Sequence, residues 1–343
     1  MKRQEESFFE KNSHKPMRIA SITKIMTAII AIESGKMNEE VKISKQAVET
    51  EGSSIYLQEG EKIKLEHLVY GLMLRSGNDA AAAIAEHVGG SLDGFAYLMN
   101  EKANQVGMFN THFANPHGLD DHENHYSTAY DMAILTQYAM KNEQFEKVFR
   151  TKTYSAPNPT EKWDRTWRNK NKLLTSLYDY STGGKTGYTK KANRTLVSTA
   201  SKDNLDLIAV TLDDPDDWND HINMFESTFD LYNKTTIQEE GFLANIDDSF
   251  YKDHLFVNRN ISYPLTEDEK KNIKVKIDLK KPNKKWERSN VPSIVGTYSV
   301  LLNNDLIQRV PVYYNNGETT PPKRGFFESL KRLFVIFVGV GDG

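Results

Sequence analysis

The sequence predicts an α+β protein, in which a cluster of helices packs on a strand-rich sheet and a smaller β-rich domain follows. Two changes along the chain predict this class. Helical segments dominate up to about residue 173, whereas strand-like segments dominate after it. Beyond residue 240, short apolar segments alternate with Asn, Lys, Pro and Gly, which is typical of a small β-domain. The length of 343 residues fits one large domain and one smaller one.

Helices are expected in the first half of the chain. The segment Ile22–Ile32 is apolar on nearly every side, and such a helix is normally buried. Asp79 is expected to cap the helix that it begins, and Gly89-Gly90 to end that helix. The other expected helices are Leu65–Leu74, Asp79–Val88, Gly94–Gln105 and Ala129–Lys141.

The strands of the large domain are expected later in the chain, at Tyr180–Tyr188, Arg194–Ser201 and Leu205–Leu212. A short polar turn that contains Asp203-Asn204 separates the last two segments, so they are expected to form a hairpin. A helix at about Trp218–Tyr232 is expected to complete this domain.

The first domain is predicted to span residues 1–235 and the small β-rich domain residues 240–318. The second domain is expected to be built from short strands separated by turn residues. Its clearest strand segments are Val275–Leu279, Gly296–Leu302 and Leu306–Tyr314.

Residues 323–338 are predicted to form an amphipathic helix. Apolar residues recur there at helical spacing, whereas the basic residues lie largely off that face. This pattern is typical of a helix on an anionic membrane surface, and the preceding Pro321-Pro322 spacer favours this interpretation. The alternative is a helix docked on its own domain. The apolar residues are Phe326, Phe327, Leu330, Leu333, Phe334 and Phe337, and the basic ones are Lys323, Arg324, Lys331 and Arg332.

Composition excludes several function classes. The chain has 47 acidic and 44 basic residues, so it lacks the basic excess that nucleic-acid binding requires. The absence of cysteine excludes disulfides, thiolate catalysis and cysteine-bound metals. The charged N-terminus is not followed by an apolar segment, and the run Leu333–Val340 is too short to span a bilayer. The protein is therefore expected in the cytoplasm unless a targeting segment precedes residue 1.

Ser21-Ile22-Thr23-Lys24 is the first candidate for catalysis. Residues three apart share a helix face, so the side chains of Ser21 and Lys24 are expected to project together from the buried helix. A serine hydroxyl becomes a good nucleophile only when a base takes its proton, and a buried lysine can be that base when its amine is neutral. The alternative is a capping serine followed by a surface lysine.

Two further motifs carry polar groups in suitable places. Ser76-Gly77-Asn78 lies between two expected helices, where Ser76 could pass a proton and Asn78 could bind both a lysine amine and a substrate amide. Lys185-Thr186-Gly187 lies in an expected strand, where glycine permits close approach of a ligand. Taken separately, an ordinary turn and a glycine-rich strand edge explain these two motifs.

In this order and in these structural contexts, the three motifs are typical of penicillin-recognising serine acyltransferases. The chain resembles the low-molecular-mass penicillin-binding proteins that are D-alanyl-D-alanine carboxypeptidases, and it is most similar to their sporulation-associated branch. The stretches that carry the resemblance are Arg18–Thr27, Gly71–Ala80, Pro116–Leu119 and Gly184–Thr189.

The resemblance implies a penicillin-binding/serine β-lactamase-like domain with an antiparallel sheet. It implies a hydrolase at the extracytoplasmic face of the cell membrane that removes the terminal D-Ala from peptidoglycan stem peptides, matures cell wall or spore cortex, and is acylated by β-lactams. No metal or cofactor is implied. It also implies an opening strand hairpin before Ser21. The segment Phe8–His14 fits only the end of that hairpin, so the first strand is expected to be missing.

The resemblance also assigns roles to the residues of the three motifs. Ser21 would be the acylated nucleophile and Lys24 its general base. The backbone N–H groups of Ser21 and Tyr188 would form the oxyanion hole, where each donor typically contributes ~3 kcal/mol. Lys185, helped by Thr186, would attract the terminal carboxylate. The catalytic set is thus Ser21, Lys24 and Ser76, and the substrate-binding set is Asn78, Lys185, Thr186, Gly187 and Tyr188.

Three other interpretations compete with this one. A class A β-lactamase would need a glutamate for deacylation, and no E-x-x-L-N sequence lies between Asn78 and Lys185. A metal site could use His117, His122 and His125, but His122-Glu-Asn-His125 is one residue short of the helical H-E-x-x-H spacing. An inactive homologue that lacks the first strand remains the third alternative.

Overall fold

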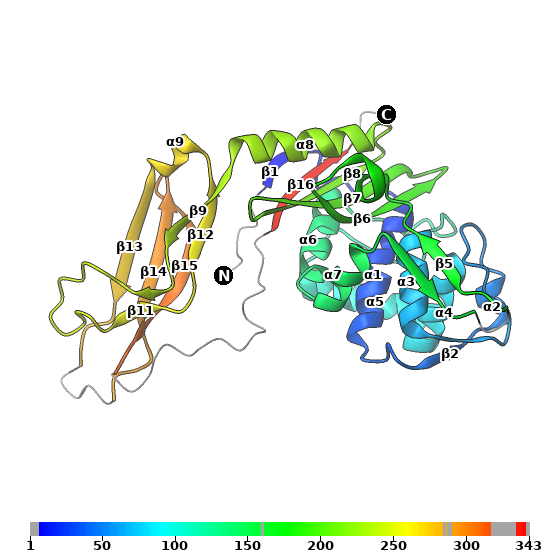
Figure 1. The fold of residues 1–343 in the computed structure, drawn as a ribbon, viewed down its shortest axis with the longest axis horizontal. Helices are drawn as coiled ribbons and strands as arrows, with labels where there is room; N and C mark the ends of the chain where they lie inside the picture. Colours follow the sequence, from blue (N-terminus) through cyan, green and yellow to red (C-terminus); the bar gives the residue numbers. More distant parts are fainter. Residues whose placement is uncertain (1–6, 159–160, 284–285, 287–289, 317–333, 341–343) are drawn as a thin grey trace. The chain divides into compact units, whose positions relative to one another are not determined.

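A computed structural model describes residues 7–158, 161–283, 286, 290–316 and 334–340 (Figure 1). The chain forms two compact units, which are described separately below. The larger unit contains the described residues up to 202, residues 206–227 and the strand at 334–340, whereas residues 228–316 belong to the smaller unit. None of the helices in these ranges is both long and apolar enough to cross a lipid bilayer.

The helical cluster of the larger unit is built around α1 (Lys24–Glu33), which continues a short 3-10 helix, η1 (Ala20–Thr23). All residues of α1 except the last are buried, as its apolar sequence predicts. The other predicted helices of this cluster are confirmed, with small shifts at their ends. The surrounding helices are α2 (Lys45–Val48), α3 (Leu65–Arg75), α4 (Asn78–Gly89), α5 (Leu92–Val106), α6 (Ala129–Ala139), α7 (Glu143–Phe149) and the π-helix η2 (Leu173–Leu177).

The predicted ends of α4 differ in outcome. Gly90 ends the helix with a left-handed φ of 76°, which confirms the predicted stop. The predicted N-cap at Asp79 is wrong, because α4 already begins at Asn78 and its N-cap is Gly77. Asp79 lies in the first turn, where its buried carboxylate accepts hydrogen bonds from the preceding loop instead.

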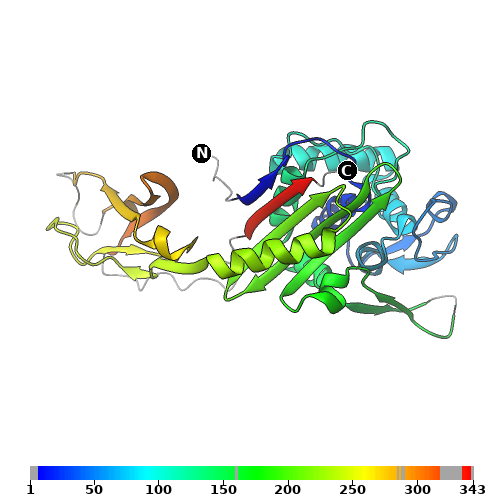
Figure 2. The same ribbon diagram turned by 90° about the horizontal axis from the view of Figure 1, so that it is seen from above.

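A five-stranded sheet with the order β1-β16-β8-β7-β6 lies beside the helical cluster (Figure 2). The strands β6 and β7 are antiparallel neighbours, as expected. The predicted hairpin turn between β7 and β8 is confirmed, since Asp203 and Asn204 have φ values of 50° and 63° that suit such a turn. The bounds are β1 (Ser7–Lys11), β6 (Ser181–Thr189), β7 (Asn193–Lys202), β8 (Leu205–Leu212) and β16 (Phe334–Val340).

The strand β16 corrects two predictions. The predicted helix at residues 323–338 is wrong for residues 334–338, which form a strand, while its part at 323–333 lies outside the described residues. β16 pairs in parallel with both β1 and β8, so the sheet is mixed rather than purely antiparallel. The physical reason is that a short, continuous apolar run rich in β-branched and aromatic residues suits a strand with a partner on each side.

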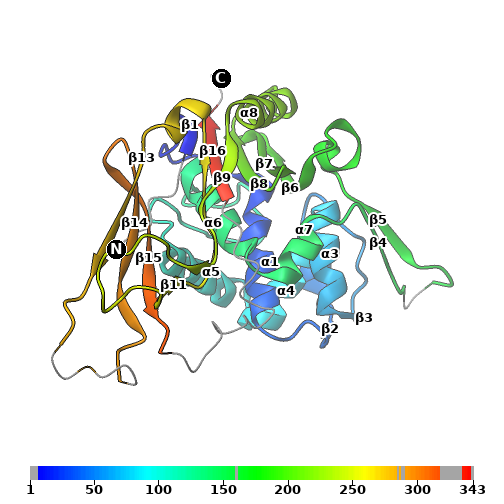
Figure 3. The same cartoon turned by 60° about the vertical axis from the view of Figure 1, so that its left-hand side comes forward.

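The larger unit also contains two small pairs of antiparallel strands and most of a covering helix. β2 (Glu40–Lys42) pairs with β3 (Lys62–Lys64) across the segment that contains α2. β4 (Thr153–Ala156) forms a hairpin with β5 (Arg165–Arg168), which extends from the helical cluster (Figure 3). The helix α8 (Asp217–Leu231) runs along the sheet face opposite the helical cluster (Figure 2). The last helix predicted for this domain is thereby confirmed.

The smaller unit is rich in β-structure, as predicted from its texture. An antiparallel sheet has the order β10-β11-β15-β14-β13, and β9 pairs separately with β12. Its core gathers Tyr251, Tyr298 and Val300 among other buried residues. The elements are β9 (Asn233–Gln238), β10 (Gly241–Phe242), β11 (Leu255–Val257), β12 (Ile261–Leu265), α9 (Glu267–Lys270), β13 (Ile273–Leu279), β14 (Ile294–Leu302) and β15 (Asp305–Tyr314).

Candidate active site

The Ser21 and Lys24 side chains meet at the start of the central helix. Ser21 lies in η1 and is half-buried, while Lys24 is the first residue of α1 and is fully buried. The Lys24 Nζ atom lies 2.9 Å from the Ser21 Oγ atom. The backbone before this pair is unusual, because Ala20 has a left-handed φ of 47°. A Cβ at Gly118 would lie 1.9 Å from the Ala20 carbonyl oxygen, so only glycine fits beside it.

The amine of Lys24 has two more partners, and both are hydrogen-bond acceptors. Its Nζ atom lies 2.7 Å from the Oδ1 atom of Asn78 and 2.7 Å from the carbonyl oxygen of His117. The Asn78 amide is oriented by its own nitrogen, which donates to the carbonyl oxygen of Glu51 at 2.6 Å. The Asn78 oxygen therefore faces Lys24, as its position in the second motif predicts.

Ser76 and Lys185 form a second buried contact. Ser76 ends α3 with a left-handed φ of 64°, and its side chain is turned toward the sheet. The Lys185 Nζ atom, on β6, donates to the Ser76 Oγ atom at 3.1 Å and to the Thr186 carbonyl oxygen at 2.6 Å. The structure thus links the second motif to the third.

The strand β6 runs directly beside η1, and glycine permits this approach. A Cβ at Gly187 would lie 2.9 Å from the Ser21 backbone nitrogen and 2.3 Å from the Thr195 hydroxyl. Thr195 on β7 in turn donates to the Ile19 carbonyl oxygen at 3.0 Å. The Tyr188 side chain is 66% exposed.

Burial and neighbouring cations lower the pKa of both lysines. The pKa of Lys24 is lowered well below its ordinary value, first by burial and then by the positive charges of Lys185 and Lys170. Burial, with a contribution from Lys170, lowers the pKa of Lys185 to about 7. The site therefore destabilises the charged form of Lys24, and Lys185 titrates near neutral pH.

The structure adds two polar groups that the motifs do not contain. Lys170 donates from its Nζ atom to the Ser53 hydroxyl at 3.1 Å and contributes positive charge to the site. The His117 carbonyl oxygen holds the Lys24 amine. No spacing rule marks Lys170, since its partners come from distant segments. The sequence does contain a signal for the His117 carbonyl, because the adjacent Gly118 marks a close approach of two backbone segments.

The histidines considered as metal ligands do not form a metal site. Both ring nitrogens of His125 have partners, the Thr23 hydroxyl at 2.8 Å and the Ala114 backbone N–H at 3.1 Å. The Nδ1 atom of His117 accepts from the Leu119 backbone N–H at 3.3 Å. Within the described ranges, no three His, Cys, Asp or Glu side chains gather as a metal-binding group.

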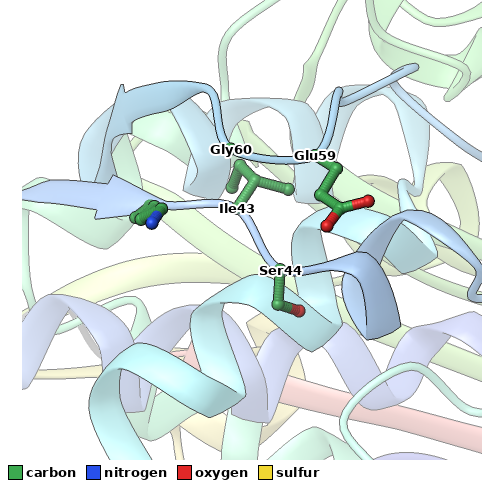
Figure 4. Close-up of a pocket in the computed structure, with 5 residues that line it drawn as sticks. Ile43, Ser44, Glu59 and Gly60 are labelled. Carbon is green, nitrogen blue, oxygen red and sulfur yellow. The ribbon is translucent and has the colours of Figure 1, made fainter.

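A separate hollow in the larger unit lies beside the β2–β3 region, and none of the motif residues lines it (Figure 4). Ser44 at its edge is already engaged, since its Oγ atom caps α2 and donates to Glu86 at 2.9 Å. The backbone groups of Ile43 and Gly60 are hydrogen-bonded to each other across the hollow at 2.8 Å. These groups stabilise the fold, and the Ser21 region is the stronger candidate for chemistry.

Comparisons with known proteins point to the same region. Residues 6–216 match the family described as D-alanyl-D-alanine carboxypeptidase, Peptidase_S11, and residues 232–319 match the penicillin-binding protein 5 C-terminal domain. The chain is 32% identical to the D-alanyl-D-alanine carboxypeptidase DacF of Bacillus subtilis, over 94% of this chain and 85% of the relative. It is 35% identical to a D-alanyl-D-alanine carboxypeptidase of a Streptomyces species, over 56% of this chain and 71% of the relative.

A solved structure extends the similarity to both units. The crystal structure of penicillin-binding protein 5 from Haemophilus influenzae matches with a TM-score of 0.70 and 25% identity, over 89% of this chain and 91% of the other. The family match covers more than half of the chain, and a relative of similar length matches almost all of it. This chain therefore belongs to the D-alanyl-D-alanine carboxypeptidase family.

Proposed function

We propose that this carboxypeptidase works through an acyl-enzyme on Ser21, with Lys24 as the general base. The observation that carries the proposal is the set of three partners around the Lys24 amine. A neutral amine has two hydrogens and one lone pair. The Asn78 and His117 oxygens can only accept, so they take the two hydrogens. With Lys24 neutral, its lone pair would face the Ser21 Oγ atom 2.9 Å away, and the Ser21 hydroxyl would donate its proton to Lys24.

The proposed reaction has two steps. The Ser21 Oγ atom loses its proton to Lys24 and bonds to the carbonyl carbon of the penultimate D-Ala, and the C–N bond to the terminal D-Ala breaks. The proton held by Lys24 then passes through the Ser76 hydroxyl to the leaving amine. Water then attacks the ester carbon, the C–O bond to Ser21 breaks, and the proton returns to the Ser21 oxygen. The shortened peptide leaves with a new carboxylate.

Substrate binding is proposed to rest on β6. Lys185 would attract the terminal carboxylate, with the hydroxyl of Thr186 as a second donor. The close approach of Gly187 to the Ser21 nitrogen supports an oxyanion hole made by the N–H groups of Ser21 and Tyr188. This arrangement would stabilise the charge that develops on the carbonyl oxygen.

The family acts on D-Ala-D-Ala peptides of peptidoglycan and binds β-lactams, so we place the protein outside the cytoplasmic membrane, in maturation of cell wall or spore cortex. The predicted domain boundaries, at residues 235 and 240–318, stay a prediction. Membrane contact through residues 323–338 also stays a prediction, and it now concerns residues 323–333, because the following residues form β16.

Intact-mass spectrometry after brief exposure to benzylpenicillin tests the proposed nucleophile. We expect the mass to rise by one penicillin, and Ser21→Ala to remove the adduct completely because the Ser21 Oγ atom is the hydroxyl held 2.9 Å from the Lys24 amine. Ser34→Ala is the matched control, since Ser34 lies at the other end of α1 and donates only to the Ala31 carbonyl oxygen at 2.7 Å. An adduct that persists in Ser21→Ala would overturn the assignment.

The lifetime of the same adduct separates the carboxypeptidase from a β-lactamase. Persistence for minutes to hours is expected, because no class A deacylation glutamate was found in the sequence. Turnover within a second would instead favour a β-lactamase. A wild-type chain that forms no adduct and releases no D-Ala would favour the inactive homologue.

A further inference from the structure

An open groove of about 620 Å³ lies in the larger unit, outside the set of motif residues. One wall is the loop at residues 54–58, and the other is formed by residues 158, 161 and 163–168, which end in β5. Arg75, the last residue of α3, completes the lining. This volume is within the usual range for a small-molecule or oligomer site.

The groove adjoins the candidate active site through the chain itself. Arg75 is followed by Ser76, and Asn78 is followed by Asp79. The Asp79 carboxylate accepts hydrogen bonds from the loop at residues 54–57, from the Ser54 hydroxyl at 2.6 Å and from two backbone N–H groups at 3.0 and 3.2 Å. The wall of the groove is thus fixed by the residue next to Asn78.

Two large aromatic side chains that line this groove are exposed to solvent. Tyr56 is 84% exposed and Trp163 is 67% exposed, although both are apolar over most of their surface. Tyr56 also has a left-handed φ of 62°, which is uncommon for a bulky residue. By contrast, Trp167 of the same lining is buried and stacks on Tyr154. Both exposed rings line one groove that also contains polar side chains, and such a combination suits a ligand with apolar faces and polar edges.

The charges that line the groove favour a neutral occupant. Arg165 is already paired with Glu61 through two hydrogen bonds, at 3.1 and 2.8 Å. The other charged side chains of the lining are two cations and two anions, so their charges cancel. These are Arg75, Arg168, Glu161 and Asp164.

We propose that this groove binds an uncharged, N-acetylated amino-sugar chain, which carries the stem peptide to Ser21. The apolar face of a sugar ring would stack on Trp163 and Tyr56, and its hydroxyl and acetamido groups would meet polar side chains such as Gln58 and Thr166. The inference rests on the proposed function, because it assigns the groove to the part of that same substrate beyond the peptide.

The test compares D-Ala release from a free stem pentapeptide with release from the same peptide carried on an N-acetylglucosaminyl-N-acetylmuramoyl disaccharide. We expect kcat/KM to be about threefold to tenfold higher for the disaccharide substrate, as stacking on one or two rings provides. In Trp163→Ala and Tyr56→Ala this ratio should fall toward one. Tyr97→Ala is the control with an unchanged ratio, because Tyr97 is an equally exposed aromatic on α5, 65% exposed, outside the groove.

A direct measurement of oligosaccharide binding tests the groove independently of catalysis. Tetra-N-acetylchitotetraose should bind the wild-type chain in saturation-transfer NMR and lose that signal in Trp163→Ala. A wild-type ratio of one without oligosaccharide binding overturns the proposal, and so does a ratio that survives both aromatic substitutions. If instead Arg75→Gln and Arg168→Gln abolish use of the free peptide, the groove holds an anionic part of the peptide. Failure to release D-Ala from either substrate, with sugar binding intact, refutes the proposed function alone.

Discussion

The backbone in front of Ser21 is held by a short relay of hydrogen bonds. The Thr23 hydroxyl donates to the Ala20 carbonyl oxygen at 2.7 Å and contacts the His125 Nε2 atom at 2.8 Å. The His125 Nδ1 atom accepts from the Ala114 N–H, so the ring hydrogen lies on Nε2 and is donated to Thr23. Burial, with the charge of nearby Arg18, lowers the pKa of His125 to about 3, so the ring stays neutral at neutral pH.

Removing the middle of this relay should slow acylation without unfolding the protein. Thr23→Val keeps the shape of the side chain but leaves Ala20, with its left-handed φ, without its hydroxyl partner. The substitution also removes the acceptor of the His125 ring N–H, so two buried hydrogen bonds are lost. A loss of about 1.4 kcal/mol in the positioning of Ser21 predicts a penicillin acylation rate about tenfold lower. Thr136→Val is the control, since Thr136 is also buried and donates to a helix carbonyl at 2.7 Å, but on α6. Equal rates in both variants would show that the relay does not position Ser21.

At the scale of single residues, the motifs predicted the chemical groups but not their supports. Ser21 and Lys24 were predictable because both belong to one helical turn, and their spacing alone puts them on one face. Lys170 and His125 were not assigned these positions, because their partners lie far away in sequence, at Ser53 and at Thr23. Only the folded backbone brings such pairs together.

At the scale of elements, α8 is joined to the sheet by a buried histidine. The Nδ1 atom of His221 lies 2.5 Å from the Ser198 hydroxyl on β7, and its Nε2 atom lies 3.1 Å from the Thr211 hydroxyl on β8. Burial lowers the pKa of His221 from 6.5 to about 3. The folded protein therefore keeps this ring neutral while the unfolded chain takes up a proton below pH 6.5.

This difference makes the attachment of α8 sensitive to acid. Since the unfolded state binds more protons than the folded state between pH 6.5 and about pH 3, the free energy of unfolding should fall as pH falls in that window. The contribution of one such histidine is about 1.4 kcal/mol for each pH unit. In urea titrations, His221→Gln should lower the slope of stability against pH by that amount, whatever its effect on stability at pH 7. Thr136→Val, at a buried side chain that does not titrate, should leave the slope as it is. If His221→Gln shows the same slope of unfolding free energy against pH as the wild-type protein, His221 is not the source of the acid sensitivity.

The elements that were predictable are those with a long periodic pattern. The α1 and α3 segments repeat apolar residues over two to three helical turns, and such patterns specify a helix strongly. The segment that became β16 has only seven residues in the strand, and a continuous apolar run of that length fits a helix or a strand equally well. Its environment decides, and that environment comes from β1 and β8 at distant positions in the chain.

At the scale of the whole chain, β16 joins segments from both ends of the sequence into one sheet. Every residue from Phe334 to Val340 is in register with a residue of β8, from Asp206 to Leu212. On its other side β16 pairs with β1, so both of its edges are paired. Among the described strands, β1 is connected to the rest of the sheet only through its pairing with β16. β16 therefore lies beside β1, at the position where the sequence predicted the partner strand of an opening hairpin.

A proline in β16 tests whether this central position is occupied in solution. Val338 lies opposite Val210 on β8 and Glu10 on β1, and proline there cannot donate to a ladder and is poorly tolerated between two strands. We expect Val338→Pro to lower the free energy of unfolding of the larger unit by about 1–3 kcal/mol, since a ladder hydrogen bond is lost, and to reduce hydrogen-exchange protection of the β8 amides. The β13–β14 amides of the smaller unit serve as the internal control and should keep their protection, because their ladder is separate. If β8 protection is unchanged and the wild-type chain instead binds anionic phosphatidylglycerol vesicles in a way that Val338→Pro weakens, the segment acts as the membrane-binding helix that its sequence pattern first suggested. The strand assignment would then be wrong.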